Sequence, residues 1–253
     1  MVLKRLDRLW FSPPAAAVRG ATAGAADLLA PSWCVGCRSP GTDLCPDCRD
    51  DLRLLTQHPY RAEGPAEALP ILEDLSVLPV LSAAEYTTLV ADAVLTFKDH
   101  QRVGLTRVLA SALERAVRSA ATLCSSEQVL LVWPPSPPRS QLRRGRHPLG
   151  ELIQQLRLPA QVMPAGHWVR HRITVTDVVR PGRGQKSRSK RARRQTQNRF
   201  SLVPGADQVL RGAEVMLVDD VLTTGATLGR LYQCLCQAGA HVSAAAVLAA
   251  TAR

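Results

Sequence analysis

The chain has 253 residues, of which 46% are apolar and only 4% aromatic, and its formal net charge is +11 at pH 7. This length fits one medium-sized domain with a small second one, and the core must consist mainly of Ala, Leu and Val. The positive charge favours a polyanionic partner: a phosphorylated small molecule, nucleic acid or an acidic protein.

The sequence shows no segment for export or membrane insertion. The first thirty residues lack the apolar run of roughly 7–15 residues that a secretory signal needs, and no stretch approaches the roughly 18 apolar residues of a membrane span. We therefore expect a cytoplasmic protein without a membrane span. Its seven cysteines are then expected to be reduced rather than paired in disulfides.

Composition along the chain predicts three parts. Residues 1–30 are expected to form a tail or a short helix, and residues 31–55 to form a module that holds four of the cysteines. Prolines and a glycine between positions 56 and 70 indicate a linker. Residues 76–253 are expected to form the main domain.

Within the main domain, short apolar runs alternate with amphipathic segments. A continuous apolar run such as 129–132 is typical of a strand buried on both faces, and the apolar spacing over 105–117 is that of a helix. Strands are expected at 76–81, 129–132, 161–169, 214–218 and 241–249, and helices at 84–97, 105–117, 147–157 and 226–238. This alternation predicts an α/β fold with a parallel sheet.

Four cysteines form two closely spaced pairs, Cys34 with Cys37 and Cys45 with Cys48. Each pair can turn both sulfurs towards one ion, and four thiolates are a ligand set of structural zinc. An iron–sulfur cluster also accepts four thiolates, and unpaired thiols in a loop are the alternative without a metal. A closed four-cysteine site is structural, so we assign it no catalysis.

A second motif follows the apolar run 214–218. Two aspartates come at the expected end of a strand, and small residues of the next turn open a helix. N–H groups at a helix N-terminus, with threonine hydroxyls, bind a phosphate dianion, and neighbouring carboxylates suit the hydroxyls of a sugar. The predicted ribose 5-phosphate site consists of Asp219, Asp220, Thr223, Thr224, Gly225, Ala226 and Thr227.

Other interpretations of this motif remain open. Paired aspartates at a strand end also bind Mg²⁺ in receiver domains, and a capped helix after a strand needs no ligand. A Walker P-loop would require a Gly-Lys-Ser/Thr ending, which the sequence lacks.

The run 215–227 resembles the phosphoribosyl pyrophosphate (PRPP) signature of type I phosphoribosyltransferases. With its four cysteines before such a domain, the chain resembles the ComF/GntX-like family over roughly residues 30–252. Further similar positions are Phe97, Lys98, Arg102, Gln185, Arg193 or Arg194, Asn198 and Phe200. The resemblance implies a Rossmann-like sheet of the type I phosphoribosyltransferase kind, a small N-terminal zinc module, and Mg²⁺ bound together with PRPP.

Two segments depart from the family pattern. A Pro-rich stretch after Val132 stands in place of a Val-Pro-Val-Pro-like segment, and Arg146, His147 and Pro148 stand where the family has Phe-Asn-Gln. Related transferases hold pyrophosphate in the loop after the first core strand. The departures therefore put PRPP turnover in question, even where ribose-phosphate binding is kept.

Residues 180–199 contain nine Arg and Lys and no acidic residue. By the resemblance, this segment is a lid that closes over the site and neutralises pyrophosphate. Binding of single-stranded DNA is a second interpretation, because basic grooves follow phosphates, and a solvated charged loop is a third. The cations considered for a lid or a nucleic-acid contact are Lys98, Arg188, Lys190, Arg191, Arg193 and Arg194.

Two functions follow. The first is a phosphoribosyltransferase-like protein that binds a ribose 5-phosphate or PRPP-type ligand; no general base can be identified for transfer. The second is a single-stranded-DNA-binding accessory protein of DNA uptake (competence) or repair that keeps the fold without turnover. The histidines show no metal-ligand spacing, so His167 and His171 are expected at the surface, and Trp133 is expected to pack beside the first core strand.

Overall fold

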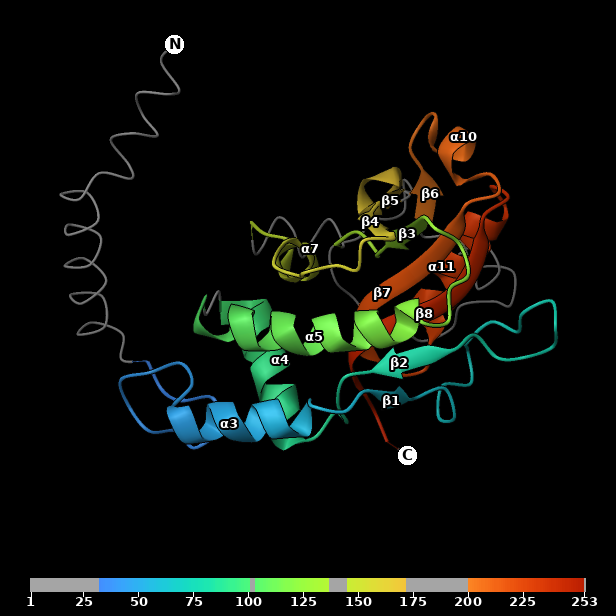
Figure 1. Cartoon of the computed structure of the whole chain (residues 1–253). Coiled ribbons are helices and arrows are strands. Elements are labelled where there is room, and N and C mark those ends of the chain that lie inside the picture. The colour runs from blue at the N-terminus through green and yellow to red at the C-terminus, as the bar shows by residue number, and fades with distance from the viewer. Residues whose placement is uncertain (1–31, 101–102, 137–144, 172–199, 253) are drawn as a thin grey trace, which may run out of the picture. The chain divides into compact units, whose positions relative to one another are not determined.

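The computed structural model describes residues 32–100, 103–136, 145–171 and 200–252 (Figure 1). The expected N-terminal tail (1–30) and the basic segment 180–199 lie outside these residues. The chain divides into two compact units, residues 1–50 and 51–253.

The second unit contains a six-stranded sheet with the strand order β1-β2-β8-β7-β3-β4 (Figure 1). Its strands are β1 (Tyr60–Arg61), β2 (Val80–Ser82), β3 (Val129–Val132), β4 (Val162–Pro164), β7 (Glu214–Leu222) and β8 (His241–Ala250). β1 is antiparallel to β2, and the other five strands are parallel to one another. The predicted α/β class with a mainly parallel sheet is therefore confirmed, and it is compatible with a Rossmann-like fold.

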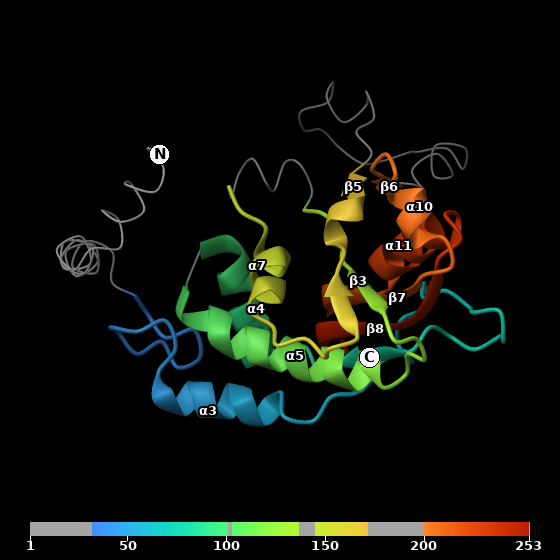
Figure 2. The same ribbon diagram turned by 45° about the horizontal axis from the view of Figure 1, so that its top comes forward.

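Helices cover both faces of this sheet (Figures 1 and 2). The helices of the described residues are α3 (Pro46–Leu55), which begins in the first unit, and α4 (Thr88–His100), η1 (Val103–Leu105), α5 (Thr106–Ala121), α7 (Pro148–Gln154), η2 (Gly166–Trp168), α10 (Ala206–Leu210) and α11 (Ala226–Cys236) in the second. α5 packs against β8 and β2 with the apolar face that its sequence spacing predicts. α11 packs on the other face, where its leucines join side chains of β7 and β8 in one hydrophobic cluster.

Small side chains fill the centre of the sheet. β8 contributes a run of buried alanines, which leaves room for helices to approach the strand closely on both faces. The buried alanines of this strand are Ala244, Ala245, Ala246, Ala249 and Ala250. The expectation of a core made mainly of Ala, Leu and Val therefore holds for the described residues.

The expected strand 161–169 is wrong as a single element. The chain leaves the main sheet after β4, turns through η2, and continues as β5 (Val169–His171), which pairs antiparallel with β6 (Phe200–Leu202) in a separate two-stranded sheet. Gly166 allows this turn, because a Cβ atom there would lie 2.2 Å from the Trp133 ring. Trp133 therefore packs beside the first core strand, as expected.

Residues 56–70 belong to the second unit and are not a free linker. Tyr60 and Arg61 pair with β2 at the edge of the sheet. Farther along, the backbone N–H of Ala68 donates to the Thr224 carbonyl at 2.8 Å. The Pro- and Gly-containing stretch 56–70 is therefore bound to the sheet unit through these contacts.

Candidate ligand site and metal centre

β3 and β7 are neighbours in the sheet, but the chain leaves their carboxyl ends in opposite directions. β3 leads through α7 to β4 on one side, and β7 leads through α11 to β8 on the other. In open α/β sheets, ligands bind outside the carboxyl ends of the strands at such a switch point. The candidate site therefore lies between the loop after β3 and the loop after β7.

β7 extends beyond β3 at this edge. The β3–β7 ladder ends at the pair Val132 and Leu217, whereas the β7–β8 ladder continues to Leu222 and Ala250. The expectation that the strand ends at the two aspartates is thus corrected. Asp219 and Asp220 lie within the strand, in the part that projects past β3.

The two aspartates have different surroundings. Successive side chains of a strand point to opposite faces, so Asp219 shares the face of Leu217, which packs with α11. Asp219 is only 8% exposed. Asp220 points to the other face, where its Oδ2 lies 2.8 Å from Nζ of Lys98 on α4. The structure therefore brings Lys98 to the site and presents Asp220, rather than Asp219, towards solvent.

Asp219 is held in a form that resists ionisation. Burial and the nearby charge of Asp220 raise the pKa of Asp219 to about 8, against the opposing effects of the Asp220 N–H and the Lys98 ammonium. The Asp220 N–H donates to Asp219 Oδ1 at 2.8 Å. A proton on Asp219 leaves one negative charge in the pair, which Lys98 balances.

The turn after β7 exposes its polar groups. Thr223 and Thr224 are exposed, and Thr227 is half-buried. Gly225 precedes α11 with φ +80°, a left-handed conformation that favours glycine. Within the described residues, the Ala226 N–H of this turn donates to Thr224 Oγ1 over a long distance of 3.4 Å. The first N–H groups of the helix therefore remain available to a ligand.

Residues 66–69 brace the other side of this turn. A Cβ atom on Gly225 would lie 2.8 Å from the Leu69 side chain, and one on Gly229 would lie 2.7 Å from the Ala68 carbonyl oxygen. Both glycines thus permit close packing of the 66–69 backbone on the start of α11. This contact fixes the loop from behind while the threonines stay exposed.

α4 and α7 are linked beside Lys98. The guanidinium of Arg146 lies over the Phe97 ring, 4.7 Å from its centre, and donates to the Phe97 carbonyl at 3.1 Å. Nε and Nη2 of the guanidinium also donate to the two oxygens of the Glu151 carboxylate. Arg146 stands where the resembled family has Phe, and here it ties α7 to the end of α4 that carries Lys98.

Two histidines contact the first residues after β3. His171 Nε2 lies 2.7 Å from the Pro135 carbonyl oxygen, and its ring contacts Phe200. His147 Nε2 lies 3.1 Å from the Ser136 backbone nitrogen. The expectation that His171 is an ordinary surface residue is therefore wrong, whereas His167 is exposed. Sequence spacing gave no signal for these contacts, because the fold creates them between separate elements.

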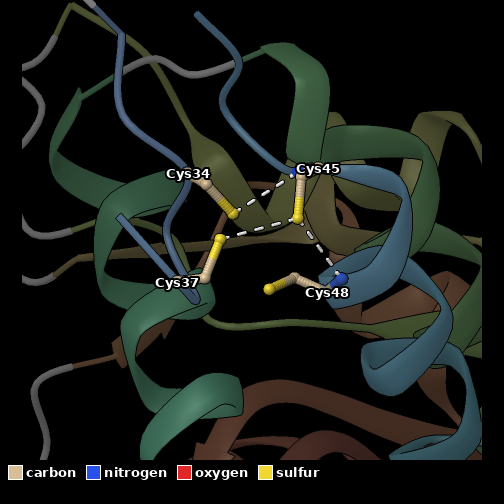
Figure 3. A group of neighbouring side chains, drawn as sticks. All are labelled: Cys34, Cys37, Cys45 and Cys48. Atoms are coloured by element: carbon tan, nitrogen blue, oxygen red, sulfur yellow. Dashed lines mark hydrogen bonds between the residues drawn. The ribbon is translucent and has the colours of Figure 1, made fainter. Parts of the chain in front are cut away.

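In the first unit, the four predicted cysteines come together (Figure 3). Their Sγ atoms all lie within 4.8 Å of one another, and Cys37 and Cys45 Sγ are 3.7 Å apart. A tetrahedral zinc ion with bonds of about 2.3 Å requires sulfurs roughly 3.8 Å apart. The cluster therefore fits zinc, and its cysteines form no disulfide.

The surroundings of the two cysteine pairs stabilise the thiolate form of some cysteines and disfavour it for others. Burial would raise the pKa of Cys34, but N–H groups of Cys45, Cys37 and Gly36 lower it to about 6. Burial and the neighbouring sulfurs raise the pKa of Cys48. Four close sulfurs cannot all ionise without a cation between them. Arg38, which follows the first cysteine pair, has a left-handed backbone with φ +64°.

Most of the cations expected in a lid or a nucleic-acid contact belong to residues whose positions the structure does not describe. Five of them lie outside the described residues: Arg188, Lys190, Arg191, Arg193 and Arg194. Lys98 is the member of that set with a known position.

In the described part of the chain, no helix has both the length and the apolar character needed to cross a membrane. A scan of the sequence against protein-family models finds no match, and a search of curated proteins finds none with significant similarity.

Proposed function

We propose that this protein binds a ribose 5-phosphate or PRPP-type ligand between the loops after β3 and β7, as a phosphoribosyltransferase-like protein. One observation carries the proposal. Asp220 is accessible on the projecting end of β7, and a turn with exposed threonines and available N–H groups follows it. This combination lies at the switch point of a parallel sheet, where such folds bind ligands.

The two halves of the ligand would meet different groups. The 5-phosphate suits the N–H groups and hydroxyls of residues 223–227, because a helix N-terminus favours an anion. The ribose hydroxyls suit the Asp220 carboxylate, which accepts hydrogen bonds. Lys98 offsets the negative charge of Asp220, so the carboxylate repels the phosphate less than an unpaired one would.

If the protein is an enzyme, it transfers ribose 5-phosphate to or from an acceptor at the C1 carbon. Mg²⁺ bound with PRPP would neutralise the pyrophosphate leaving group. The residues described here supply binding and orientation of the sugar, and we assign none of them as a general base. PRPP-type ligands and reduced thiols both fit a cytoplasmic location.

The test is calorimetric titration of the full chain with ribose 5-phosphate. Asp220→Asn should weaken binding by roughly tenfold or more, because hydrogen bonds to a charged group are worth about 1.5–3 kcal/mol. Asp207→Asn is the matched control. It makes the same change of charge at an exposed position of α10, which precedes β7 and lies towards the opposite edge of the sheet.

Equal affinity of the wild type and the Asp220→Asn variant would contradict the proposed site. Absence of ribose 5-phosphate binding by the wild type would overturn the ligand class itself. Both variants should unfold at nearly the wild-type temperature, which separates loss of binding from loss of fold.

We further infer that Cys34, Cys37, Cys45 and Cys48 hold a structural zinc ion. The support is the close approach of four sulfur atoms and the N–H groups directed at them. Thiolate ligands favour zinc over harder ions. The ion would stabilise a unit that has few residues for a core of its own.

Binding of single-stranded DNA is a second candidate, because nine of the twenty residues at 180–199 are cationic and the net charge is +11. An oligonucleotide arm in the same calorimetric series tests it. Affinity that falls steeply with added salt would support this function. Tight oligonucleotide binding without sugar-phosphate binding would favour it over the first.

A further inference from the structure

A cavity of about 260 Å³ lies between α5 and the chain at the end of α7. The two helices pack against each other (Figure 2). Among the described residues, the cavity is lined by Arg107, Ala110, Ser111, Glu114, Gln155 and Arg157. None of these residues belongs to the loops after β3 and β7, so the cavity is separate from the candidate ligand site.

The sequence of α5 places four of the lining residues on one face of the helix. Positions 107, 110, 111 and 114 are three or four residues apart, a spacing that makes helical side chains neighbours. Ala110 has the shortest side chain of the four and is buried. It therefore leaves a hollow between the longer side chains of Arg107 and Glu114, opposite the chain that follows α7.

Two hydrogen bonds hold the backbone of Arg157 against α5. Its N–H donates to Glu114 Oε2 at 2.9 Å, and its carbonyl accepts from Arg118 Nη2 at 2.7 Å. Arg118 also donates to Glu114 Oε1 at 3.1 Å. Both oxygens of this carboxylate are thus engaged and its charge is paired with a cation. The acidic residue in the wall therefore repels an anion less than an unpaired carboxylate would.

The polar groups that remain in the cavity are donors. Arg107 and Arg157 are exposed, and among the described residues their guanidinium groups have no acidic partner. Ser111 Oγ accepts from Arg115 Nη1 at 2.9 Å, so the hydroxyl proton can be donated to another group. The side-chain amide of Gln155 supplies a further donor. This combination of donors and positive charge suits an anion.

We propose that this cavity binds the phosphate group of a small molecule, with Arg107 and Arg157 donating to its oxygens from opposite walls. Guanidinium groups bind phosphate through strong, charge-assisted hydrogen bonds, and two of them match the charge of a dianion. The oxygens of a phosphate group point in different directions and can accept from both walls at once, whereas the two oxygens of a carboxylate lie in one plane.

The size of the cavity limits the ligand. Pockets that enclose drug-sized molecules measure about 300–1,000 Å³, so a volume of about 260 Å³ favours a phosphate ion or a small phosphate ester over a nucleotide. The proposal does not rest on the proposed function, because neither Asp220 nor the turn 223–227 lines the cavity.

The test is titration of the full chain with inorganic phosphate at constant ionic strength, followed by NMR. The Nε–H signals of Arg107 and Arg157 should shift together and saturate with one Kd. Arg157→Gln should raise the Kd measured at Arg107 roughly tenfold or more, the effect of losing a hydrogen bond to a charged group. The backbone of residue 157 makes the contacts with α5, so glutamine should leave the fold unchanged. Arg211→Gln, the same loss of charge at an exposed position after α10, should not alter the Kd.

This measurement distinguishes the cavity from the turn after β7, because phosphate bound there would shift the amide signals of Thr224 and Ala226. Shifts at these amides without shifts at Arg107 and Arg157 would overturn the present proposal and leave the proposed function intact. Equal Kd values for the wild type and Arg157→Gln, shifts that grow without saturation, or equal affinity for acetate would also overturn it. A parallel titration with glycerol 3-phosphate separates the two sources of the group. Binding at least as tight as that of inorganic phosphate would identify an ester as the ligand, and much weaker binding would identify the free ion.

Discussion

Two buried carboxylates on β7, those of Glu214 and Asp219, have pKa values shifted in opposite directions. Burial would raise the pKa of Glu214, but the Ser243 hydroxyl and the N–H groups of Ser126 and Ser125 lower it to about 2. Asp219 has one such donor, and its pKa rises to about 8. The first carboxylate stabilises the folded sheet at neutral pH, whereas the second opposes folding once it ionises.

Asp219→Asn should therefore stabilise the protein, and increasingly so as the pH rises. The unfolded carboxyl titrates near 3.9 and the folded one at about 8, so between these values the folded state retains a proton that the unfolded state has lost. Wild-type stability then falls with rising pH, and asparagine removes this loss. Urea unfolding at pH 5 and pH 8 should show a gain on the order of a few kcal/mol at pH 8 and a smaller gain at pH 5.

Asp207→Asn is the control for this comparison. Asp207 is exposed on α10, before β7 begins, so asparagine there should give no stabilisation that grows with pH. A gain from Asp219→Asn of equal size at both pH values would show that Asp219 is already ionised at pH 5. The account of its burial would then be wrong.

The sequence identified the acidic pair and the turn after it, but not their unequal roles. Asp219 and Asp220 are adjacent and identical in type, and only the packing of α11 on one face and α4 on the other distinguishes them. Lys98 entered the prediction through a resemblance, without a partner. His147 and His171 were assessed by their spacing along the chain, while their contacts depend on where α7 and β5 lie.

At the scale of single elements, α11 depends on glycine for its contact with residues 66–69. Gly229→Ala would gain up to about 1 kcal/mol in helix propensity. However, the new Cβ would lie 2.7 Å from the Ala68 carbonyl oxygen, a backbone atom that cannot swing away. We expect net destabilisation of about 1–3 kcal/mol in urea unfolding. Weaker ribose 5-phosphate binding should accompany it, because the same contact supports the loop.

Gln233→Ala provides the comparison within the same helix. This side chain is exposed on α11, so its loss should change stability by less than about 0.5 kcal/mol. Stabilisation by Gly229→Ala would show that residues 66–69 yield easily. The contact with residues 66–69 would then not be what fixes the turn after β7.

Elements with a strong repeated pattern were predicted well, and short ones were not. The run 129–132 is a strand with those bounds, and α5 has the predicted apolar face. β6 and α10 have three and five residues, too few to show a period. The strand expected at 76–81 begins only at Val80, because Leu72 and Ser76 close a turn before it.

At the scale of the whole molecule, the two units depend on different forces. The sheet unit has a continuous hydrophobic cluster, whereas the described part of the first unit contains the cluster of four cysteines. The sequence predicted this division through the cysteine spacing. It placed the start of the second unit too late, because the Pro-rich stretch 56–70 looks like a linker until its pairing with β2 is known.

Metal removal should therefore affect the units separately. Purified protein should contain about one zinc ion per chain, and a strong chelator should make residues 32–50 sensitive to limited proteolysis. The thermal unfolding of the sheet unit and its affinity for ribose 5-phosphate should remain, because neither uses a cysteine of the cluster. Cys45→Ser should reproduce the effect of the chelator, while Cys124→Ser, outside the cluster, should retain the zinc.

Visible absorbance from iron would identify an iron–sulfur cluster instead of zinc. Loss of sugar-phosphate binding on chelation would show that the ion stabilises both units, and the separation argued from their cores would fail.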